Sequence, residues 1–449
     1  MSYISFAFLL ILVTASSLTN AQPSVTKFER GQTENRIHLA IIGDGYTEQN
    51  IRDQYIPKVD STLEYMFYNP TKVVPYPRYR NFINVYRIDI VSQDSGVDEL
   101  SSNNYRNTAL GGEDGCTDYR IGVCGANWSL VHDAFEDAAS MNGFNPVWYW
   151  VLLNNTKYNA AAHYAARGTL PIYSAHYEGH WDMRDIALHE AAHAWHDLAD
   201  EYGGNANYTG GEIGQVNVTN DSSGAKWQRW LGFEMPSGLE MGVFEGARYH
   251  DTGLYRPSRS SKMNGGPDDC HYLGNYCAHN MVGIEKIILD IYDIVTPIDR
   301  HFDNTQTLIG PKQLWIETID PEVLMVDWLV DGVVVQRKGS EQFEVSDYLS
   351  EHGTYTVTAR AWDEVIEHAF SDNSNPHSLD MVRKDLDKLE ESVEWKVVIE
   401  QSQLPPTTVL TPVATPPVLV PSSSSGGGSM GGTFTLVLML LAGRRRWRA

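Results

Sequence analysis

The chain has 449 residues, and its 57 Asp and Glu residues outnumber its 34 Lys and Arg residues, which gives a formal net charge of −23. Nucleic acid and anionic membranes are therefore disfavoured as partners, because both carry charge of the same sign. Such acidity keeps an exported protein soluble, and surface solvation alone is enough to explain it.

The chain begins with an apolar run of signal-peptide length, MSYISFAFLLILVTASSLTNA. The run ends on small residues, so we predict export and cleavage after Ala21. It departs from the usual pattern in having no Lys or Arg near its start. The apolar stretch is also shorter than a membrane span requires.

Strand-like and helical segments alternate between residues 35 and 200. The sequences NRIHLAIIGDGYTEQN, FINVYRIDIVSQDSG and PVWYWVLLNN predict strands, whereas WSLVHDAFEDAASM predicts a helix. This alternation is typical of an α/β or mixed layered domain. Asp44 lies between two glycines and is a candidate for binding a metal or a substrate amine. The commoner role is a tight turn in which the Asp hydrogen-bonds its own backbone.

Four cysteines form two close pairs, Cys116 with Cys124 and Cys270 with Cys277. In an exported chain an even number of cysteines favours disulfides, and we predict these local pairs among three possible connectivities. A zinc ion held by cysteines is the alternative. It is disfavoured because neither pair has the C-x-x-C spacing.

The sequence HEAAHAWHDLADEY at residues 189–202 is predicted to lie on a helix. Asp182 is a candidate N-cap, Asp185 is favoured in the first turn by the helix dipole, and Gly203–Gly204 is the expected end. The alternative to a functional site is a solvated helical surface on which the histidine spacing arises by chance.

His189 and His193 are one helical turn apart on the same face, so both imidazoles can bind one ion. Glu190 points to the adjacent side. There it can act on an activated water without being a ligand, which is the position that a general base requires. We therefore predict a catalytic zinc site with Glu190 as general base and acid.

A catalytic zinc needs a third protein ligand. In a continuous helix Asp200 would lie about 10 Å beyond His193 along the axis, so the chain must turn after His193. Asp200 is the predicted third ligand because it is nearest in register, and Glu201 is the second choice. Asp197 and, less favoured, His196 are the other near candidates.

The required turn resembles the metzincin arrangement, in which the helix ends soon after the second histidine and a methionine turn lies beneath the metal. Here no Gly stands three residues after His193, and Ala199 takes the usual position of the third ligand. Met263, in YRPSRSSKMNGG, is a candidate for the methionine turn, with plain core packing as the alternative. Tyr202 and Tyr255 are candidates for the oxyanion donor, although structural roles are commoner.

After Pro297–Ile298–Asp299 the pattern changes to short alternating runs, with Asp331–Gly332 as a two-residue hairpin turn. These runs predict a small all-β, immunoglobulin-like sandwich with Trp328 and Trp362 in its core. Its role is either to pack against the enzyme or to bind a partner outside it.

The C-terminal tail combines a Pro/Thr/Val-rich run, the spacer SSSSGGGSMGG, the apolar stretch TFTLVLMLLAG and the basic end RRRWRA. The apolar stretch falls short of the roughly 20 residues that a membrane span needs, so a processed tail is favoured over a retained anchor. The tail resembles the GlyGly-CTERM signals of Gram-negative bacteria. That resemblance implies transient residence in the inner membrane, removal by a rhomboid-type sorting protease, and release to the cell surface or the medium.

Several separated motifs together resemble the IgA-peptidase-like M64 family of zinc metallopeptidases. They are IIGDGYT at 41–47, RYRNFINVYRIDIVSQDSG at 78–96, HEAAH followed by LADEY, and YRPSRSSKM before a helix that ends in Pro297–Ile298–Asp299. The resemblance implies a zinc endopeptidase of metzincin-like fold, with one zinc ion on His189, His193 and Asp200 and with Glu190 as catalytic residue. Small residues commonly fill the family's segment between HExxH and LADEY, whereas this chain has AWHD. Cleavage of immunoglobulin A does not follow from these motifs.

The predicted architecture is a mixed α/β (α+β) metzincin-like peptidase domain followed by an all-β sandwich. The segments are a signal peptide (1–21), the zinc peptidase domain (22–303), the sandwich (304–402), a linker (403–425) and the sorting tail (426–449). We expect a monomeric zinc endopeptidase, secreted or at the cell surface, that acts on proteins or peptides. The alternative is a surface adhesion protein with a degenerate peptidase scaffold, which the intact Glu190 and both histidines disfavour.

Overall fold

A computed structural model describes residues 24–31, 33–117, 120–124, 127–155, 160–165, 168–174, 183–235, 240–264, 278–365 and 380–400. The predicted signal peptide, linker and sorting tail, the proposed helix cap Asp182, and Cys270 and Cys277 lie outside the described residues. The described residues, from Ser24 to Glu400, belong to one compact unit. Among the described residues, no helix is both long enough and apolar enough to cross a bilayer.

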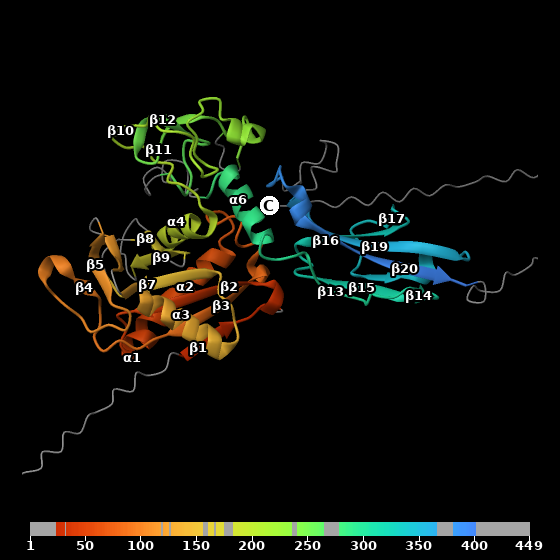
Figure 1. Ribbon diagram of the computed structural model, residues 1–449, viewed down its shortest axis with the longest axis horizontal. Coiled ribbons are helices and arrows are strands. Elements are labelled where there is room, and N and C mark those ends of the chain that lie inside the picture. The colour runs from red at the N-terminus through yellow and green to blue at the C-terminus, as the bar shows by residue number, and fades with distance from the viewer. Residues whose placement is uncertain are drawn as a thin grey trace, which may run out of the picture. The chain divides into compact units, whose positions relative to one another are not determined.

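The first part of the chain is built on a six-stranded sheet with the order β1-β3-β2-β7-β9-β8 (Figure 1). Strands β3, β2, β7 and β9 run parallel, while β1 and β8 are antiparallel edge strands. The strands are β1 (Ser24–Phe28), β2 (Ile37–Asp44), β3 (Ile83–Asp89), β7 (Trp148–Leu153), β8 (Ala160–Ala165) and β9 (Gly168–Ser174). The three predicted strands correspond to β2, β3 and β7.

Helices cover both faces of this sheet. The helical segments are α1 (Glu48–Asn50), a π-helical stretch (Ile51–Tyr55), α2 (Ile56–Tyr68), α3 (Trp128–Asn142), α4 (Met183–His196) and α6 (Met281–Tyr292). Short 3-10 turns cover Thr33–Asn35, Arg80–Phe82, Leu100–Ser102, Ala225–Trp230 and Leu386–Leu389.

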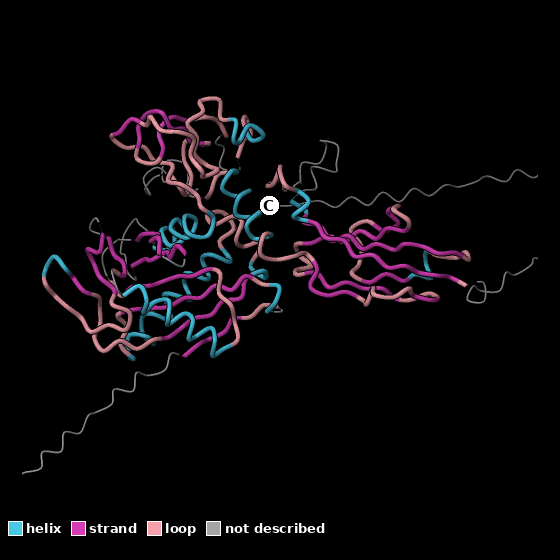
Figure 2. Tube along the Cα trace, in the orientation of Figure 1, coloured by secondary structure: helices cyan, strands magenta, loops and turns pink. Residues whose placement is uncertain are grey.

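Strand β2 shows how the two faces are separated. Ile37, Leu39 and Ile41 belong to the hydrophobic cluster that includes α2, α4 and α6, whereas Ala40 and Ile42 belong to the cluster of α3. Successive side chains of a strand point to opposite faces, so a strand buried on both sides is apolar throughout. The sequence prediction of a mixed α/β layered domain is therefore confirmed at this level, and Figure 2 shows helix and strand interleaved along this part.

Two three-stranded sheets extend this part of the chain. One contains β4 (Asp98–Glu99), β5 (Gly112–Thr117) and β6 (Arg120–Val123), and the other contains β10 (Ala206–Asn207), β11 (Phe244–Ala247) and β12 (His250–Arg256). Cys124, directly after β6, takes part in a disulfide bond. The side chain of Cys116 lies outside the described residues, so the predicted pairing stays a prediction.

Asp44 ends β2 and is completely buried. Its carboxylate accepts hydrogen bonds from the backbone N–H groups of Leu110 (2.9 Å) and Gly112 (2.7 Å) and from Ser92 Oγ (3.3 Å). Burial raises the pKa of this carboxyl group, and the backbone donors oppose the shift. Asp44 therefore has the structural role that the sequence favours. Its carboxylate hydrogen-bonds the distant segment at Leu110 and Gly112 in addition to the backbone of its own turn at Gly45.

Beyond α6, two sheets enclose a separate hydrophobic cluster that contains Trp328. One sheet has the order β13-β15-β18 and the other β14-β20-β19-β16-β17. Their bounds are β13 (Ile298–His301), β14 (Leu308–Ile309), β15 (Gln313–Thr318), β16 (Leu324–Val330), β17 (Val333–Gln336), β18 (Gln342–Glu344), helix α7 (Val345–Tyr348), β19 (Gly353–Asp363) and β20 (Glu390–Ile399). Asp331 and Gly332 form the β16–β17 turn with φ of 48° and 78°, the left-handed values of a two-residue hairpin. The immunoglobulin-like topology stays a prediction.

Trp362 corrects the sequence prediction, because it does not belong to the sandwich core. It is buried in the large cluster that also contains Phe82 and Tyr292. The adjacent Asp363 is fully buried and accepts hydrogen bonds from Tyr79 Oη (2.7 Å), Tyr292 Oη (2.8 Å) and Arg78 (2.6 Å). The end of β19 thus joins the α/β core.

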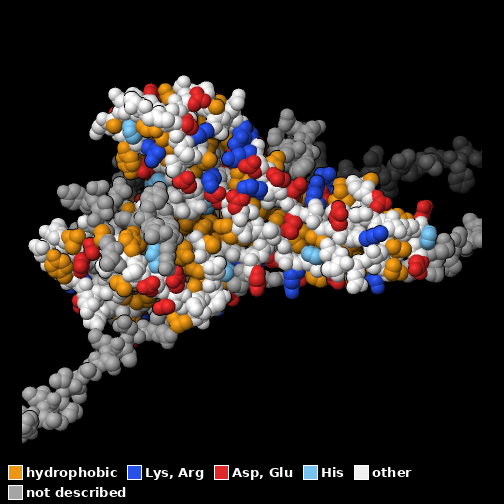
Figure 3. All heavy atoms as spheres, in the orientation of Figure 1, with side chains coloured by type: hydrophobic (Ala, Val, Ile, Leu, Met, Phe, Trp, Pro, Cys, Tyr) orange, Lys and Arg blue, Asp and Glu red, His pale blue; other side chains and the backbone are white. Residues whose placement is uncertain are grey.

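Acidic and basic side chains are interspersed over the face of the molecule in Figure 3. The net charge of −23 is therefore not accompanied by a single uninterrupted acidic surface on this face.

Candidate metal centre

Helix α4 carries the predicted motif and is fixed at its start by ion pairing. Ala187, Leu188, Ala191 and Ala192 form its buried side. Asp185 in the first turn accepts hydrogen bonds from Lys262 Nζ (2.8 Å) and Tyr65 Oη (2.5 Å). Burial favours the neutral acid, but Lys262 and Tyr65 outweigh it and lower the pKa of Asp185.

The helix ends at His196, seven residues before the predicted stop at Gly203. Asp197 adopts φ of 48°, a left-handed conformation that reverses the chain. The N–H of Leu198 then bonds to the carbonyl of Ala192 at 3.2 Å, as in a helix-ending turn. This reversal is the turn that a third ligand requires, although the sequence prediction placed the end of the helix too late.

The reversal brings Asp200 back to the two histidines. His189 Nε2 and His193 Nε2 are 3.1 Å apart, and Asp200 Oδ1 lies 3.1 Å from each of them. The three side chains are 13–18% exposed. They form a group whose ligand atoms lie close enough to hold one ion.

Hydrogen bonds on the other ring nitrogens orient both imidazoles. His189 Nδ1 contacts the carbonyl of Lys262 at 2.8 Å, and His193 Nδ1 contacts the carbonyl of Leu198 at 2.5 Å. A carbonyl accepts only, so each Nδ1 carries the proton and each Nε2 of a neutral ring presents a lone pair. Metal-binding histidines commonly donate their other ring N–H to a backbone carbonyl in this way, which fixes the orientation of the ring.

The spacing of these three acceptors fits a metal ion. Ligands about 2.0–2.1 Å from a tetrahedral centre are roughly 3.3 Å apart, close to the 3.1 Å found here. Burial lowers the pKa of His189, but the hydrogen bond and charge of Asp200 outweigh it and raise this pKa to about 9. The carboxylate of Asp200 thus stabilises positive charge beside it, which is a proton on His189 when no ion is bound and would be the ion itself in a metal-bound site.

Two tyrosines hold Asp200 from the other side. Tyr249 Oη donates to Asp200 Oδ2 at 3.0 Å and lies 2.6 Å from Tyr202 Oη. Burial and the nearby carboxylate raise the pKa of Tyr202. The sequence named Tyr202 as a candidate and missed Tyr249, which lies about fifty residues along the chain with no recognisable spacing.

The remaining candidates lie elsewhere. Glu201 is buried and accepts hydrogen bonds from Ser261 Oγ (2.6 Å) and from the amides of Asn217 (2.9 Å) and Asn280 (2.9 Å), and its burial raises its pKa. His196 contacts Tyr76 Oη (3.0 Å) and Asp290 (2.9 Å), and Asp197 accepts a hydrogen bond from Gln215. Tyr255 bonds through its backbone to Thr219. The described contacts place none of these four in the histidine cluster.

Met263 packs against the end of α4 and the loop that follows it. Ser261–Asn264 is a tight turn closed by a 3.0 Å backbone hydrogen bond, and the buried Met263 side chain packs with Ala192 and Leu198. The neighbouring Lys262 carbonyl is the one that orients His189. Met263 therefore supports the site through packing.

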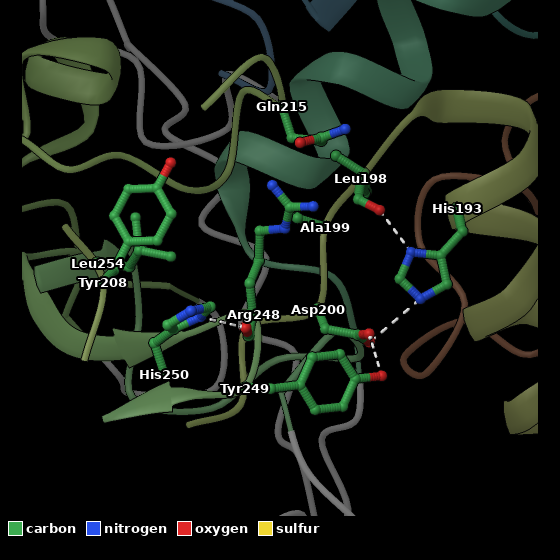
Figure 4. A pocket seen from close by; sticks show the side chains of 10 residues that line it. All are labelled: His193, Leu198, Ala199, Asp200, Tyr208, Gln215, Arg248, Tyr249, His250 and Leu254. Carbon is green, nitrogen blue, oxygen red and sulfur yellow. Dashed lines mark hydrogen bonds and ion pairs between the residues drawn. The ribbon is translucent and has the colours of Figure 1, made fainter. Parts of the chain in front are cut away.

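A pocket of about 270 Å³ adjoins the centre. Figure 4 shows its lining residues, with the guanidinium of Arg248 next to Ala199 and the carboxylate of Asp200 directed at His193. They are His193, Leu198, Ala199, Asp200, Tyr208, Gln215, Arg248, Tyr249, His250 and Leu254.

The family described as IgA Peptidase M64 matches residues 25–238, a segment that includes His189, Glu190, His193 and Asp200. This match supports a peptidase. Among curated proteins, no sequence is significantly similar to the chain. The solved structure of SGBP-B from a Bacteroides ovatus mixed-linkage glucan utilization locus, in complex with a mixed-linkage heptasaccharide, is 17% identical over 23% of this chain and 23% of that chain, with a TM-score of 0.15.

Proposed function

We propose that the chain is a zinc-dependent endopeptidase that hydrolyses peptide bonds in proteins or peptides. The observation that carries this proposal is the convergence of His189, His193 and Asp200 at 3.1 Å, with Glu190 on the same helix as the two histidines. Two imidazoles and one carboxylate are a donor set typical of catalytic zinc, which leaves a coordination position for water or substrate. The similarity of residues 25–238 to M64 peptidases supports the same reaction.

In this proposal the bound ion supplies Lewis-acid activation of water and of the scissile carbonyl. Glu190 takes the proton of the attacking water and delivers it to the leaving amine. The Lys262 and Leu198 carbonyls keep both histidines in the tautomer with a free Nε2. Tyr249 donates to Asp200 Oδ2, which leaves Oδ1 directed at the histidines.

Export belongs to the same proposal. It rests on the apolar N-terminal run and on the Gly/Ser spacer, apolar stretch and basic end of the tail. We propose that a sorting protease removes the tail and that the mature protein acts as a monomer at the cell surface or in the medium. A purely adhesive role would leave the complete set of His189, Glu190, His193 and Asp200 without a use.

The purified mature protein is expected to hydrolyse casein, because casein is an unfolded and sequence-diverse substrate. Treatment with a chelator should abolish hydrolysis, because it removes the ion that activates the attacking water. Stoichiometric zinc should restore hydrolysis, because the two imidazoles and the carboxylate can bind the ion again. Release of new peptide N-termini is the measurement. Hydrolysis that survives complete metal removal would refute the zinc mechanism.

A further inference from the structure

The tip of the β11–β12 hairpin has an unexpected sequence. Ala247 pairs with His250, so Arg248 and Tyr249 are the two central residues of the turn, with φ of 46° and 63°. A two-residue turn with both φ values positive normally contains Asn-Gly or a similar pair, because a Cβ is unfavourable in this conformation. Backbone strain of this kind is concentrated at functional sites.

The tip is fixed against the loop that carries the third candidate ligand. The N–H of Arg248 bonds to the Asp200 carbonyl at 3.1 Å, and the N–H of Tyr249 bonds to the Tyr202 carbonyl at 3.2 Å. A Cβ on Gly204 would lie 2.2 Å from the Tyr249 carbonyl oxygen, so only glycine permits this approach. These contacts are made by backbone atoms, so an Asn-Gly turn would make them equally well.

The two side chains therefore need an explanation of their own. Tyr249 has one, since its hydroxyl supports Asp200. Arg248 is exposed and lines the pocket that adjoins the metal centre, with its guanidinium drawn next to Ala199 (Figure 4). Within the described part of the chain, no hydrogen bond or ion pair engages its guanidinium.

The chemistry of the pocket indicates what would pair with this guanidinium. Leu198, Ala199 and Leu254 supply apolar walls, Gln215 is a neutral polar group, and Arg248 is the single Arg or Lys among the described lining residues. A guanidinium binds a carboxylate through two parallel hydrogen bonds, with a geometry that an amide cannot match. Because His193 and Asp200 line the same pocket, its occupant adjoins the bond to be cleaved.

We propose that Arg248 is a specificity-determining residue that selects an Asp or Glu side chain next to the scissile bond. The inference rests on the proposed peptidase function. With a net charge of −23, the protein as a whole disfavours acidic segments, so such a preference has to come from a local cation.

The test is cleavage of a random peptide library with amidated C-termini, with the product ends sequenced. Wild type is expected to enrich Asp and Glu at one position beside the cleaved bond by about tenfold or more, the range of a charge-assisted hydrogen bond. Arg248→Asn should lose the enrichment and Arg248→Glu should favour Lys or Arg there. Asn tolerates the left-handed turn, so loss of preference would not reflect unfolding. Arg300→Asn, at an exposed arginine of the sandwich, is the matched control and should keep the wild-type profile.

A second readout does not depend on turnover. Two labelled peptides that differ only by Glu or Gln at the enriched position are titrated into Glu190→Gln protein and followed by fluorescence anisotropy. The Glu peptide should bind about tenfold more tightly, and Arg248→Asn introduced into this protein should equalise the two.

The possible failures are distinguishable. Cleavage without acidic preference, a preference retained by Arg248→Asn, or a preference that appears only with free C-terminal carboxylates would overturn this inference and leave the peptidase function standing. Absence of cleavage by the zinc-loaded protein would overturn both.

Discussion

Replacing Glu190 by glutamine is expected to lower kcat by about 10²–10⁴-fold, the usual contribution of a positioned general base. Glutamine has nearly the same shape as glutamate but cannot accept the proton of the attacking water. The three candidate ligands are untouched by the change, so metal content and thermal stability should equal those of wild type. Peptide hydrolysis under saturating substrate measures the effect.

A matched control is Glu64→Gln, which makes the same change at an exposed position of helix α2. It should leave kcat within about twofold of wild type, because surface changes away from the site have little effect. If Glu190→Gln kept most of the wild-type rate while holding its metal, another group would have to take the proton.

Replacing Asp363 by asparagine is expected to reduce the free energy of unfolding by about 3–5 kcal/mol, as for removal of one partner of a buried ion pair. The carboxylate has 0% side-chain exposure, and Arg78 beside it has 18%. Arg78 would lose its countercharge, and Tyr79 and Tyr292 would lose the acceptor that their hydroxyl groups share. Urea unfolding followed by fluorescence measures the change.

Glu322→Gln provides the comparison for the Asp363 variant. Its partner Arg80 also joins the α/β part to the strands beyond α6, but this pair is exposed, with 32% and 72% of the two side chains accessible. Surface ion pairs contribute about 0–1 kcal/mol, so only a small loss of stability is expected. Equal stability losses for the two variants would show that burial at Asp363 does not matter.

The sequence predicted those parts of the site that depend on local geometry. His189 and His193 are one turn apart in any helix, and Glu190 then lies on the side of the helix adjacent to the face of the two histidines. The strands of the central sheet were likewise visible as apolar runs, because a strand covered on both faces has no polar side.

The ends of the helix and the contacts between distant segments were not predictable in the same way. Gly203–Gly204 suggested a helix stop, yet Asp197 reverses the chain, and Gly204 is needed where the Tyr249 carbonyl approaches. The left-handed conformation of Asp197 has only a weak sequence signal. Arg248 and Tyr249 gave no turn signal because they occupy positions where Asn-Gly is expected.

Trp362 illustrates another limit of a sequence pattern. Alternation along β19 predicts which side chains share a face of the strand, but not which core that face meets at each end. The last residues of β19 reach the α/β cluster, so Trp362 is buried there, while Trp328 lies in the separate cluster between the two sheets beyond α6.

The central claim is that one zinc ion binds between His189, His193 and Asp200. The most direct measurement is anomalous diffraction at energies above and below the zinc edge, on crystals of protein purified without added metal. The account predicts one zinc peak per chain, in contact with His189 Nε2, His193 Nε2 and Asp200 Oδ1. A folded protein that hydrolyses peptides with no peak at these atoms, or with zinc held elsewhere, would contradict it.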